Sequence, residues 1–322
     1  MDTLTLGTRG SQLALFQAHA VAGLLRERDG VECEIVVIKT SGDRLSEASL
    51  AEIGGKRLFV KEIEDALLDR TIDLAVHSSK DMPALLPPGL AIGAVLPRED
   101  ARDAVVLPHG GETLALEDIV RRLGRAPRIG TSSVRRIAQL TRMFPGGRFL
   151  PIRGNLDTRL RKVDAGEFDA IVLAAAGLRR LRHQSRISAA LPPDTCVPAP
   201  GQGIIAVEIR SDDERVRERV TRITDPAAAA ALSAERALVT RLGGGCQMPI
   251  GAFAAEVGTE LRMIAIVVSV DGSRAARAET RGPIGDAERI GVAAAEQLLA
   301  RGAADILADV EQAQGAVEGI QP

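Results

Sequence analysis

The spacing of apolar and polar residues predicts alternating strands and helices over roughly the first 200 residues. Short apolar runs at 4–8, 32–39, 73–78 and 169–174 are typical of buried strands. Longer segments with helical spacing separate them. Alternation of this kind favours parallel sheets with helices on both faces, which is the doubly wound α/β architecture.

The first helix is the clearest of these segments. Ser11 is placed to cap it, and the helical pattern runs to about Arg28. The apolar residues predicted to form its buried face are Leu13, Phe16, Ala20 and Leu24.

The chain changes character after residue 190. Prolines and glycines between 192 and 203 mark a linker, and the strand predicted at 204–209 follows it, which indicates a return into the first unit. Three alternating segments after residue 250 predict an antiparallel sheet in a smaller α+β unit. The tail at 312–322 is expected to fray.

These elements predict three domains. The first is an α/β domain formed by residues 1–99 with 200–217, and the second is an α/β domain over 100–199. The third is a C-terminal α+β domain over 218–322.

The amino-acid composition argues against several classes of function. The 322 residues carry a net charge of −2, so no overall field attracts nucleic acid or a membrane surface. No apolar run reaches the ~20 residues of a membrane span, and residues 1–7 lack the features of a signal peptide, so we expect a cytoplasmic protein. Tyr and Trp are absent, which argues against stacking on single-stranded nucleic acid. Three widely spaced cysteines argue against a disulfide framework and against a metal site.

Arginines recur where helices begin. A cation at a helix N-terminus opposes the helix dipole, unless a bound anion interacts with both the guanidinium and the free backbone N–H groups. Any one of these arginines, taken alone, is better explained as a solvated surface residue. Together they predict a cleft for a ligand with several carboxylates, since neither phosphate-loop glycine pattern is present. They are Arg9, Arg135, Arg136, Arg153, Arg159 and, after a further strand, Arg180.

Lys80 and Asp81 follow a buried strand and belong beside this cleft. A carboxylate among cations stays ionised, which suits the stabilisation of a positive charge on a substrate. A local ion pair or a turn aspartate before Met82 is the alternative. His77, inside the strand, is interpreted as a core histidine.

A run of three glycines precedes Cys246. Without side chains, residues 243–245 would leave room for a bulky group to approach the sulfur. The alternative is a tight turn that ends a helix and buries a small cysteine.

Eight motifs, in order along nearly the whole chain, resemble the porphobilinogen deaminase family. Any one of them would be a weak signal, but their order makes the resemblance specific. They are 8–15 (TRGSQLAL), 54–62 (GGKRLFVKE), 77–81 (HSSKD), 130–136 (GTSSVRR), 153–155 (RGN) with 158–160 (TRL), 176–181 (AGLRRL), 200–203 (PGQG) and 243–251 (GGGCQMPIG).

The resemblance implies two domains similar to periplasmic binding proteins, followed by a third that carries the cysteine. It implies that Cys246 holds a dipyrromethane cofactor through a thioether. Four porphobilinogen molecules would be deaminated and joined head to tail onto this primer, and hydrolysis would release hydroxymethylbilane.

Residue roles follow from the same resemblance. Asp81 would stabilise the cationic substrate intermediate, with Lys80 beside it. Residues 42–57 would form a mobile loop over the site. The cofactor would be bound by Lys80, Asp81, Ser133, Arg135 and Arg136. The substrate would be bound by Arg9, Ser11, Phe59, Arg153, Arg159, Arg180 and Gln202.

The family also implies a monomer, with a transient transfer of product to uroporphyrinogen-III synthase. The rival hypothesis is a cytoplasmic polycarboxylate-binding or sensor module on the same fold. Such a module would need the arginines, but it would not need Asp81 or an accessible Cys246.

Overall fold

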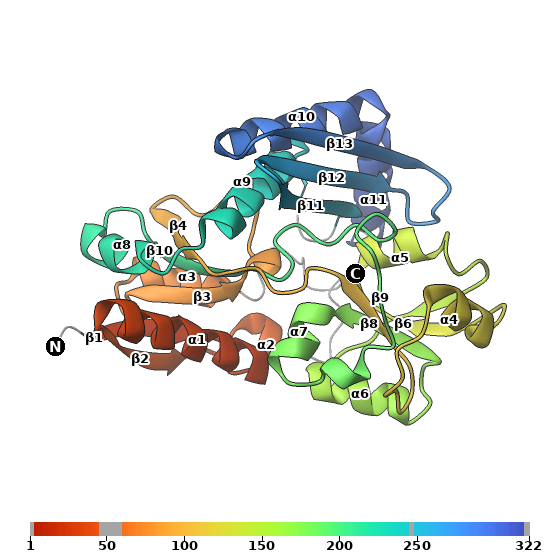
Figure 1. Cartoon of the computed structure of the whole chain (residues 1–322), viewed down its shortest axis with the longest axis horizontal. Coiled ribbons are helices and arrows are strands. Elements are labelled where there is room, and N and C mark those ends of the chain that lie inside the picture. The colour runs from red at the N-terminus through yellow and green to blue at the C-terminus, as the bar shows by residue number, and fades with distance from the viewer. Residues whose placement is uncertain (1–2, 45–59, 245–247, 319–322) are drawn as a thin grey trace.

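The computed structural model describes residues 3–44, 60–244 and 248–318. Figure 1 shows three units: the first at the left, the second at the right, and the C-terminal unit above them. Cys246 and Phe59 lie outside the described residues. Of the loop expected at 42–57, residues 42–44 belong to a short helix instead, and 45–57 lie outside the described residues.

The first unit is built on a five-stranded sheet in the order β2-β1-β3-β10-β4. Its strands are β1 (Thr3–Thr8), β2 (Glu32–Val37), β3 (Leu74–Ser78), β4 (Leu90–Val95) and β10 (Ile205–Arg210). Its helices are α1 (Gln12–Asp29), α2 (Ser41–Arg44), α3 (Lys61–Leu68), the 3-10 turn η2 (Ser79–Asp81) and α8 (Glu214–Thr221).

The second unit has a five-stranded sheet in the order β7-β6-β8-β5-β9. Its strands are β5 (Asp103–Val106), β6 (Arg128–Gly130), β7 (Arg148–Leu150), β8 (Ala170–Ala174) and β9 (Ala189–Ala190). Its helices are α4 (Leu116–Leu123), α5 (Val134–Leu140), α6 (Leu156–Asp164), α7 (Ala175–Arg180) and the 3-10 turn η3 (Gln184–Arg186).

Neither sheet is purely parallel, and the expectation of parallel sheets is wrong for one strand in each. In the first sheet β10 runs antiparallel to both β3 and β4. In the second, β5 runs antiparallel to β8 and β9. Each reversed strand is the one by which the chain enters that sheet from the other unit. Such a strand arrives without a helical crossover from a parallel neighbour, so the rule that makes βαβ strands parallel does not apply to it.

Helix α1 shows how local sequence and packing act together. The Ser11 hydroxyl accepts a hydrogen bond from the Ala14 N–H, as predicted for the cap, and Gly30 ends the helix in the left-handed region at φ 64°. The predicted buried face is wrong, because Phe16 is 42% exposed. The stripe that packs on the sheet is one position further along, and its small alanines let the helix lie close to the strands. It consists of Ala14, Gln17, Ala18, Val21 and Leu25.

The C-terminal unit is an antiparallel sheet in the order β11-β12-β13, covered by helices. Its elements are α9 (Pro226–Arg241), β11 (Ile250–Val257), β12 (Glu260–Val268), β13 (Ala275–Pro283), the 3-10 turn η4 (Ile284–Asp286), α10 (Ala287–Ala300) and α11 (Ala303–Glu318). Gly291 lets α10 approach α9, since a Cβ there would lie 2.0 Å from the Ala234 carbonyl oxygen. The fraying expected from residue 312 is wrong up to 318, where α11 ends.

The predicted fold class is therefore confirmed as two α/β units followed by a smaller unit with three antiparallel strands. Hydrophobic clusters lie on both faces of the first sheet, one against α1 and α8 and the other against α3. In the described part of the chain, no helix has the length and apolar character needed to cross a membrane.

A buried glutamate joins the C-terminal unit to the other two. Glu235 of α9 is fully buried and accepts from Arg98 Nη1 at 2.6 Å and from the Gly201 N–H at 2.6 Å. Arg98 lies on the segment leaving the first unit, and Gly201 on the segment returning to it. The Ala254 N–H of β11 also donates to Glu235, at 2.8 Å. One carboxylate thus holds both connecting segments against the third unit.

We expect Glu235→Gln to lower the free energy of unfolding by about 3–5 kcal/mol, because it leaves Arg98 without its charged partner in a buried position. Urea unfolding measures the change. Glu296→Gln is the matched control, since Glu296 pairs with Arg241 on the surface, where such pairs contribute about 0–1 kcal/mol. Equal losses in the two variants would contradict the assigned role of Glu235.

Candidate functional site

Most of the predicted site residues lie where a strand gives way to a helix. Within each sheet the strands that precede them run parallel, so their carboxyl ends lie along one edge. These residues are Arg9 and Ser11 after β1, Lys80 and Asp81 after β3, Ser133, Arg135 and Arg136 after β6, Arg153 and Arg159 after β7, and Arg180 after β8.

Local capping fixes two of these junctions. The Ser133 hydroxyl accepts from the Arg136 N–H at 3.4 Å and begins α5. The Asn155 side chain accepts from the Thr158 N–H at 2.9 Å and begins α6. Capping uses an oxygen lone pair, so the hydroxyl protons of Ser133 and Ser11 remain able to donate to a carboxylate.

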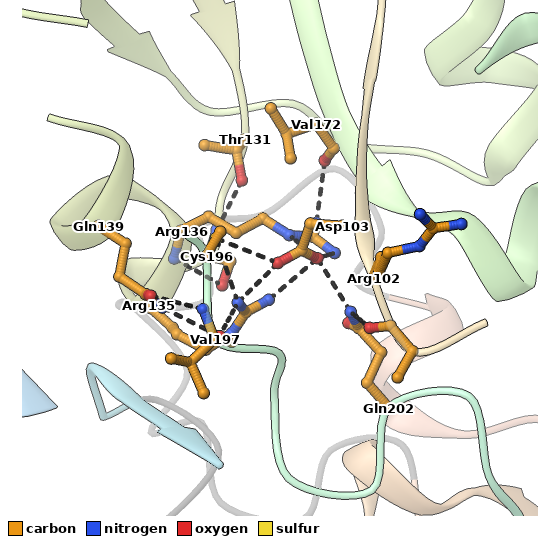
Figure 2. A network of polar contacts seen from close by, with 12 residues as sticks. Arg102, Asp103, Thr131, Arg135, Arg136, Gln139, Val172, Cys196, Val197 and Gln202 are labelled. Carbon is orange, nitrogen blue, oxygen red and sulfur yellow. Dashed lines mark hydrogen bonds and ion pairs between the residues drawn. The ribbon is translucent and has the colours of Figure 1, made fainter. Parts of the chain in front are cut away.

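Figure 2 shows the centre of the site, where Arg135 and Arg136 share the buried carboxylate of Asp103. Arg135 Nη1 donates to Asp103 Oδ2 at 2.7 Å and to the Val197 carbonyl at 2.8 Å. Arg136 Nε donates to Asp103 Oδ1 at 2.9 Å, and its Nη1 donates to the Val172 carbonyl at 2.9 Å. The two guanidinium groups hold the pKa of Asp103 far below its usual value despite its burial, so it is ionised.

Gln202 connects this cluster to the first unit. Its side-chain amide donates to Asp103 Oδ1 at 3.0 Å and to the Ala101 carbonyl at 2.6 Å. Lys80 Nζ lies 3.5 Å from the Gln202 side-chain oxygen. Predicted residues from two units are thus brought together around one carboxylate.

The Lys80 ammonium has an unusual environment. Burial lowers its pKa to about 8, with a further lowering from Arg136 and Arg135, while Asp81 and Asp103 act in the opposite direction. Lys80 is therefore mostly protonated at neutral pH and close to titration. A bound carboxylate would stabilise the charged form.

Arg159 and Arg180 are less hydrated than surface arginines. Burial lowers the pKa of each to about 10, and for Arg159 the nearby charges of Arg136 and Arg153 lower it further. Both stay protonated at neutral pH. Arg159 Nε donates to the Gly154 carbonyl at 2.9 Å, and Arg180 Nη2 donates to the Gly203 carbonyl at 2.7 Å.

Asp81 faces solvent at the rim of this cluster. Its side chain is exposed, and its charge acts on both Lys80 and Arg159. The structure therefore groups Lys80, Asp81, Arg136, Arg159 and Gln202. Arg153 belongs to this group through its proximity to Arg159. Arg9 and Ser11 lie at the start of α1, which packs on α7.

A cavity of about 80 Å³ lies next to Lys80 and Arg135. Two buried donors beside it, Ser79 Oγ and Arg135 Nε, have no hydrogen-bond partner among the described residues. Buried polar groups normally have partners, so these two donors fit an anionic or hydrogen-bonding guest. The cavity has polar lining from Ser79, Lys80, Ser133, Arg135 and Arg236 and apolar lining from Met82, Ala84, Ala199, Pro200, Leu232, Val239, Met248 and Ile250.

The two described cysteines are unsuited to nucleophilic chemistry. Burial raises the pKa of the Cys196 thiol to about 12, with the Asp103 charge adding to the shift. Burial also raises the pKa of Cys33 to about 11, aided by Glu32 and Asp73. Both stay protonated at neutral pH, and a thiol attacks as its thiolate.

Asp103 is the central residue that sequence reasoning missed. It lies close to the predicted boundary between residues 1–99 and 100–199, and no role in the site was predicted for it. Gln139, which pairs with both backbone groups of Val197 at 2.7 and 3.0 Å, was missed as well. A usable signal for Asp103 was its position as the first residue of an otherwise apolar strand, since a buried charge there requires partners.

Comparison with known proteins gives the family. Residues 4–218 match the family model "porphobilinogen deaminase, dipyromethane cofactor binding domain", and residues 229–300 match the porphobilinogen deaminase C-terminal domain. This chain belongs to the porphobilinogen deaminase family. It is 45% identical to the porphobilinogen deaminase of Geotalea daltonii over 97% of this chain and 96% of that protein. It is 47% identical to that of Moorella thermoacetica over 99% and 100%.

A more distant likeness is to a solved structure. The VFT2 domain of BvgS from Bordetella pertussis aligns with a TM-score of 0.41 and 16% identity, covering 69% of this chain and 85% of that one.

The prediction of a dipyrromethane cofactor is confirmed at the level of the family, since the matched region is its cofactor-binding domain. The described residues fit such a group: the cavity beside Lys80, Ser133 and Arg135 offers cationic and hydroxyl donors for carboxylates, and its apolar lining suits a pyrrole ring. Attachment to Cys246, which lies outside the described residues, stays a prediction.

The pKa of Lys80 gives a test of this environment. Lys80 loses its proton at about pH 8 when folded and near 10.5 when unfolded, so between these values the unfolded chain binds more protons and stability rises with pH. We expect the free energy of unfolding of Lys80→Met, relative to that of wild type, to be highest below pH 8. This relative gain in stability should be lost by pH 10. Urea unfolding of both proteins at pH 7.5 and 10 measures this.

Lys61→Met is the control, because Lys61 is exposed and pairs with Asp65 on the surface of α3. A difference between wild type and Lys80→Met that does not change with pH would contradict the assigned environment.

Proposed function

We propose that this chain is a cytoplasmic porphobilinogen deaminase, a transferase of tetrapyrrole biosynthesis. It would deaminate four porphobilinogen molecules, join them head to tail onto a covalently bound dipyrromethane primer, and release hydroxymethylbilane. The observation that carries the proposal is the cluster of cationic side chains around Asp103 and Lys80, with Asp81 at its rim. Family membership agrees with it.

The cations would bind the substrate. Each porphobilinogen carries an acetate and a propionate, so a growing chain accumulates carboxylates. Guanidinium groups bind carboxylates with two parallel hydrogen bonds, and weak hydration makes this binding more favourable. Arg159 and Arg180 have the reduced hydration that suits the role, and Arg9, Arg153 and Ser11 would extend the binding surface. Gln202 would act through Lys80, and Phe59 completes the proposed set.

Asp81 would act on the reacting carbon. Loss of ammonia from porphobilinogen leaves a cationic methylene-pyrrole, and an ionised carboxylate next to it lowers the energy of that cation. Lys80 and Arg159 are the cations on which the charge of Asp81 acts. The same carboxylate can accept the proton released when two pyrroles are joined.

Cys246 would hold the cofactor through a thioether. The cofactor, when bound, supplies the pyrrole carbon to which the first substrate is joined. The raised pKa of Cys196 and of Cys33 leaves Cys246 as the cysteine suited to this attachment. Lys80, Ser133, Arg135 and Arg136 would hold the cofactor carboxylates, with Asp81 close to its reacting end.

Several wider features belong to the same proposal. The domains would be 1–99 with 200–217, 100–199 and 218–322, and the enzyme would act as a monomer. The linear product would pass by transient contact to uroporphyrinogen-III synthase.

A non-catalytic polycarboxylate-binding or sensor module on this fold is the alternative. The buried hydrogen-bond donors and the arginines would bind a polycarboxylate equally well in such a module. The exposed Asp81 at the rim of the cations favours the enzyme, because a carboxylate there repels a carboxylate ligand and is useful only for a cation.

Mass spectrometry of the intact protein tests the covalent cofactor. We expect protein made in cells with normal tetrapyrrole synthesis to exceed its polypeptide mass by one dipyrromethane unit. Cys246→Ser should have the bare polypeptide mass and no turnover, because no thiolate is present to form the thioether. Cys33→Ser, which removes a thiol outside the site, should keep the added mass and the activity. Wild-type protein of bare polypeptide mass would refute the proposal.

Asp81→Ala tests the chemistry separately from the attachment. We expect this variant to keep the cofactor mass and to lose turnover by about a hundredfold or more, the usual cost of removing a group that stabilises a developing charge. Steady-state kinetics with porphobilinogen measure the loss. Asp212→Ala is the control, because Asp212 pairs with Arg70 on the surface. Substantial turnover in Asp81→Ala would exclude the proposed role.

A further inference from the structure

Asp103 contacts several residues of the site, and no role in the reaction has yet been assigned to it. Oδ1 accepts from Arg135 Nη2 at 3.1 Å, Arg136 Nε at 2.9 Å and Gln202 Nε2 at 3.0 Å. Oδ2 accepts from Arg135 Nη1 at 2.7 Å, and the Cys196 sulfur lies 3.5 Å away. The side chain is fully buried, so this carboxylate is too enclosed to meet a substrate.

The backbone of Asp103 is held as firmly as its side chain. Asp103 begins β5, pairs with Ala174 of β8, and its carbonyl accepts from the Leu191 N–H at 2.8 Å. It therefore lies inside a sheet rather than on a loop. A group fixed in this way can hold others in one geometry.

Asp103 also lies where the two connecting segments run side by side. The Glu99 N–H donates to the Gly203 carbonyl at 3.0 Å, and Arg98 Nε donates to the Gln202 carbonyl at 2.9 Å. Gln202, on the returning segment, bridges Asp103 to Lys80 of the first unit. The contacts from Asp103 therefore reach cations in both units.

We propose that Asp103 is a positioning residue for the reaction, an inference that rests on the proposed function. Its carboxylate holds Arg135 and Arg136 of the second unit and, through Gln202, Lys80 of the first unit in the single arrangement that meets the carboxylates of cofactor and substrate. It touches none of the reacting atoms. The cations keep their places before any ligand arrives, which removes the cost of organising them during binding.

A matched carboxylate exists elsewhere in the molecule. Asp29 at the end of α1 has a side chain only 2% exposed and pairs with both Arg219 and Arg222. It reproduces the arrangement of one buried aspartate between two arginines, away from the site. Loss of stability is therefore common to Asp103→Asn and Asp29→Asn, whereas a change in catalysis is expected only for Asp103→Asn.

The experiment compares wild type, Asp103→Asn and Asp29→Asn as full-length holoenzymes. Intact mass gives the fraction that carries cofactor, thermal unfolding gives stability, and kinetics with porphobilinogen are corrected to the loaded fraction. We expect both variants to melt at lower temperature than wild type. Loaded Asp103→Asn should lose on the order of a hundredfold in kcat/KM, since displacement of binding groups by about 1 Å has that effect. Asp29→Asn should keep the wild-type value.

Two further readouts separate positioning from a general structural role. Asp103 raises the pKa of Lys80, so the alkaline limb of kcat/KM, if it reports Lys80, should move to lower pH in Asp103→Asn and stay in place in Asp29→Asn. In a double-mutant cycle with Arg136→Gln, the loss in the double variant should be smaller than the product of the two single losses, because part of the effect of Asp103 passes through that arginine.

Kinetics of loaded Asp103→Asn that match those of Asp29→Asn, or losses that multiply in the double variant, would overturn the inference. If Asp103→Asn does not fold, Gln202→Met decides, since it removes the bridge to Lys80 and leaves Asp103 with both arginines. Wild-type kcat/KM and an unshifted alkaline limb in Gln202→Met would then refute the positioning role. A wild-type enzyme without cofactor mass or turnover would instead refute the proposed function itself.

Discussion

Two guanidinium groups cannot lie next to each other in a protein interior unless a negative charge lies between them. Arg135 and Arg136 are consecutive residues and both are buried, and the ionised carboxylate of Asp103 provides that charge. Removing two cations from water is costly, so the rest of the fold is built around satisfying them. The carbonyls of Val172 and Val197 and the amides of Gln139 and Gln202 complete the arrangement.

This arrangement leaves positive charge both at the centre of the site and around it. At its centre one carboxylate is shared by two guanidiniums, so a net positive charge remains after pairing. Further out, Lys80, Arg159 and Arg180 are cations whose pKa values are lowered by burial, which shows that each is incompletely hydrated. A ligand with several carboxylates would provide these incompletely hydrated cations with negatively charged partners. The site attracts such a ligand because it is arranged before the ligand arrives.

The sequence was sufficient for features that depend on local chemistry. Ser11 caps its helix as predicted, and the arginines lie at the junctions where the pattern placed them. It was insufficient where packing between distant segments decides. The buried face of α1 is offset from the predicted one because alanines, rather than the larger Phe16, meet the sheet. Asp103 looked like a boundary residue because the partners of its side chain are far away in sequence, the nearest being Arg135 at |i−j| = 32.

The reversed strands have a consequence for how the chain is made. The second unit, from β5 to β9, is continuous in sequence, whereas the first sheet lacks β10 until residue 210 has been synthesised. Since β10 lies between β3 and β4, its absence leaves a gap within the sheet rather than a missing edge. On the ribosome the second unit can therefore fold before the first. Until β10 is made, the facing edges of β3 and β4 in the first unit have no strand between them to pair with. The segment that completes the first sheet also brings Gln202 to Asp103, so Lys80 is linked to Asp103 only when that sheet closes.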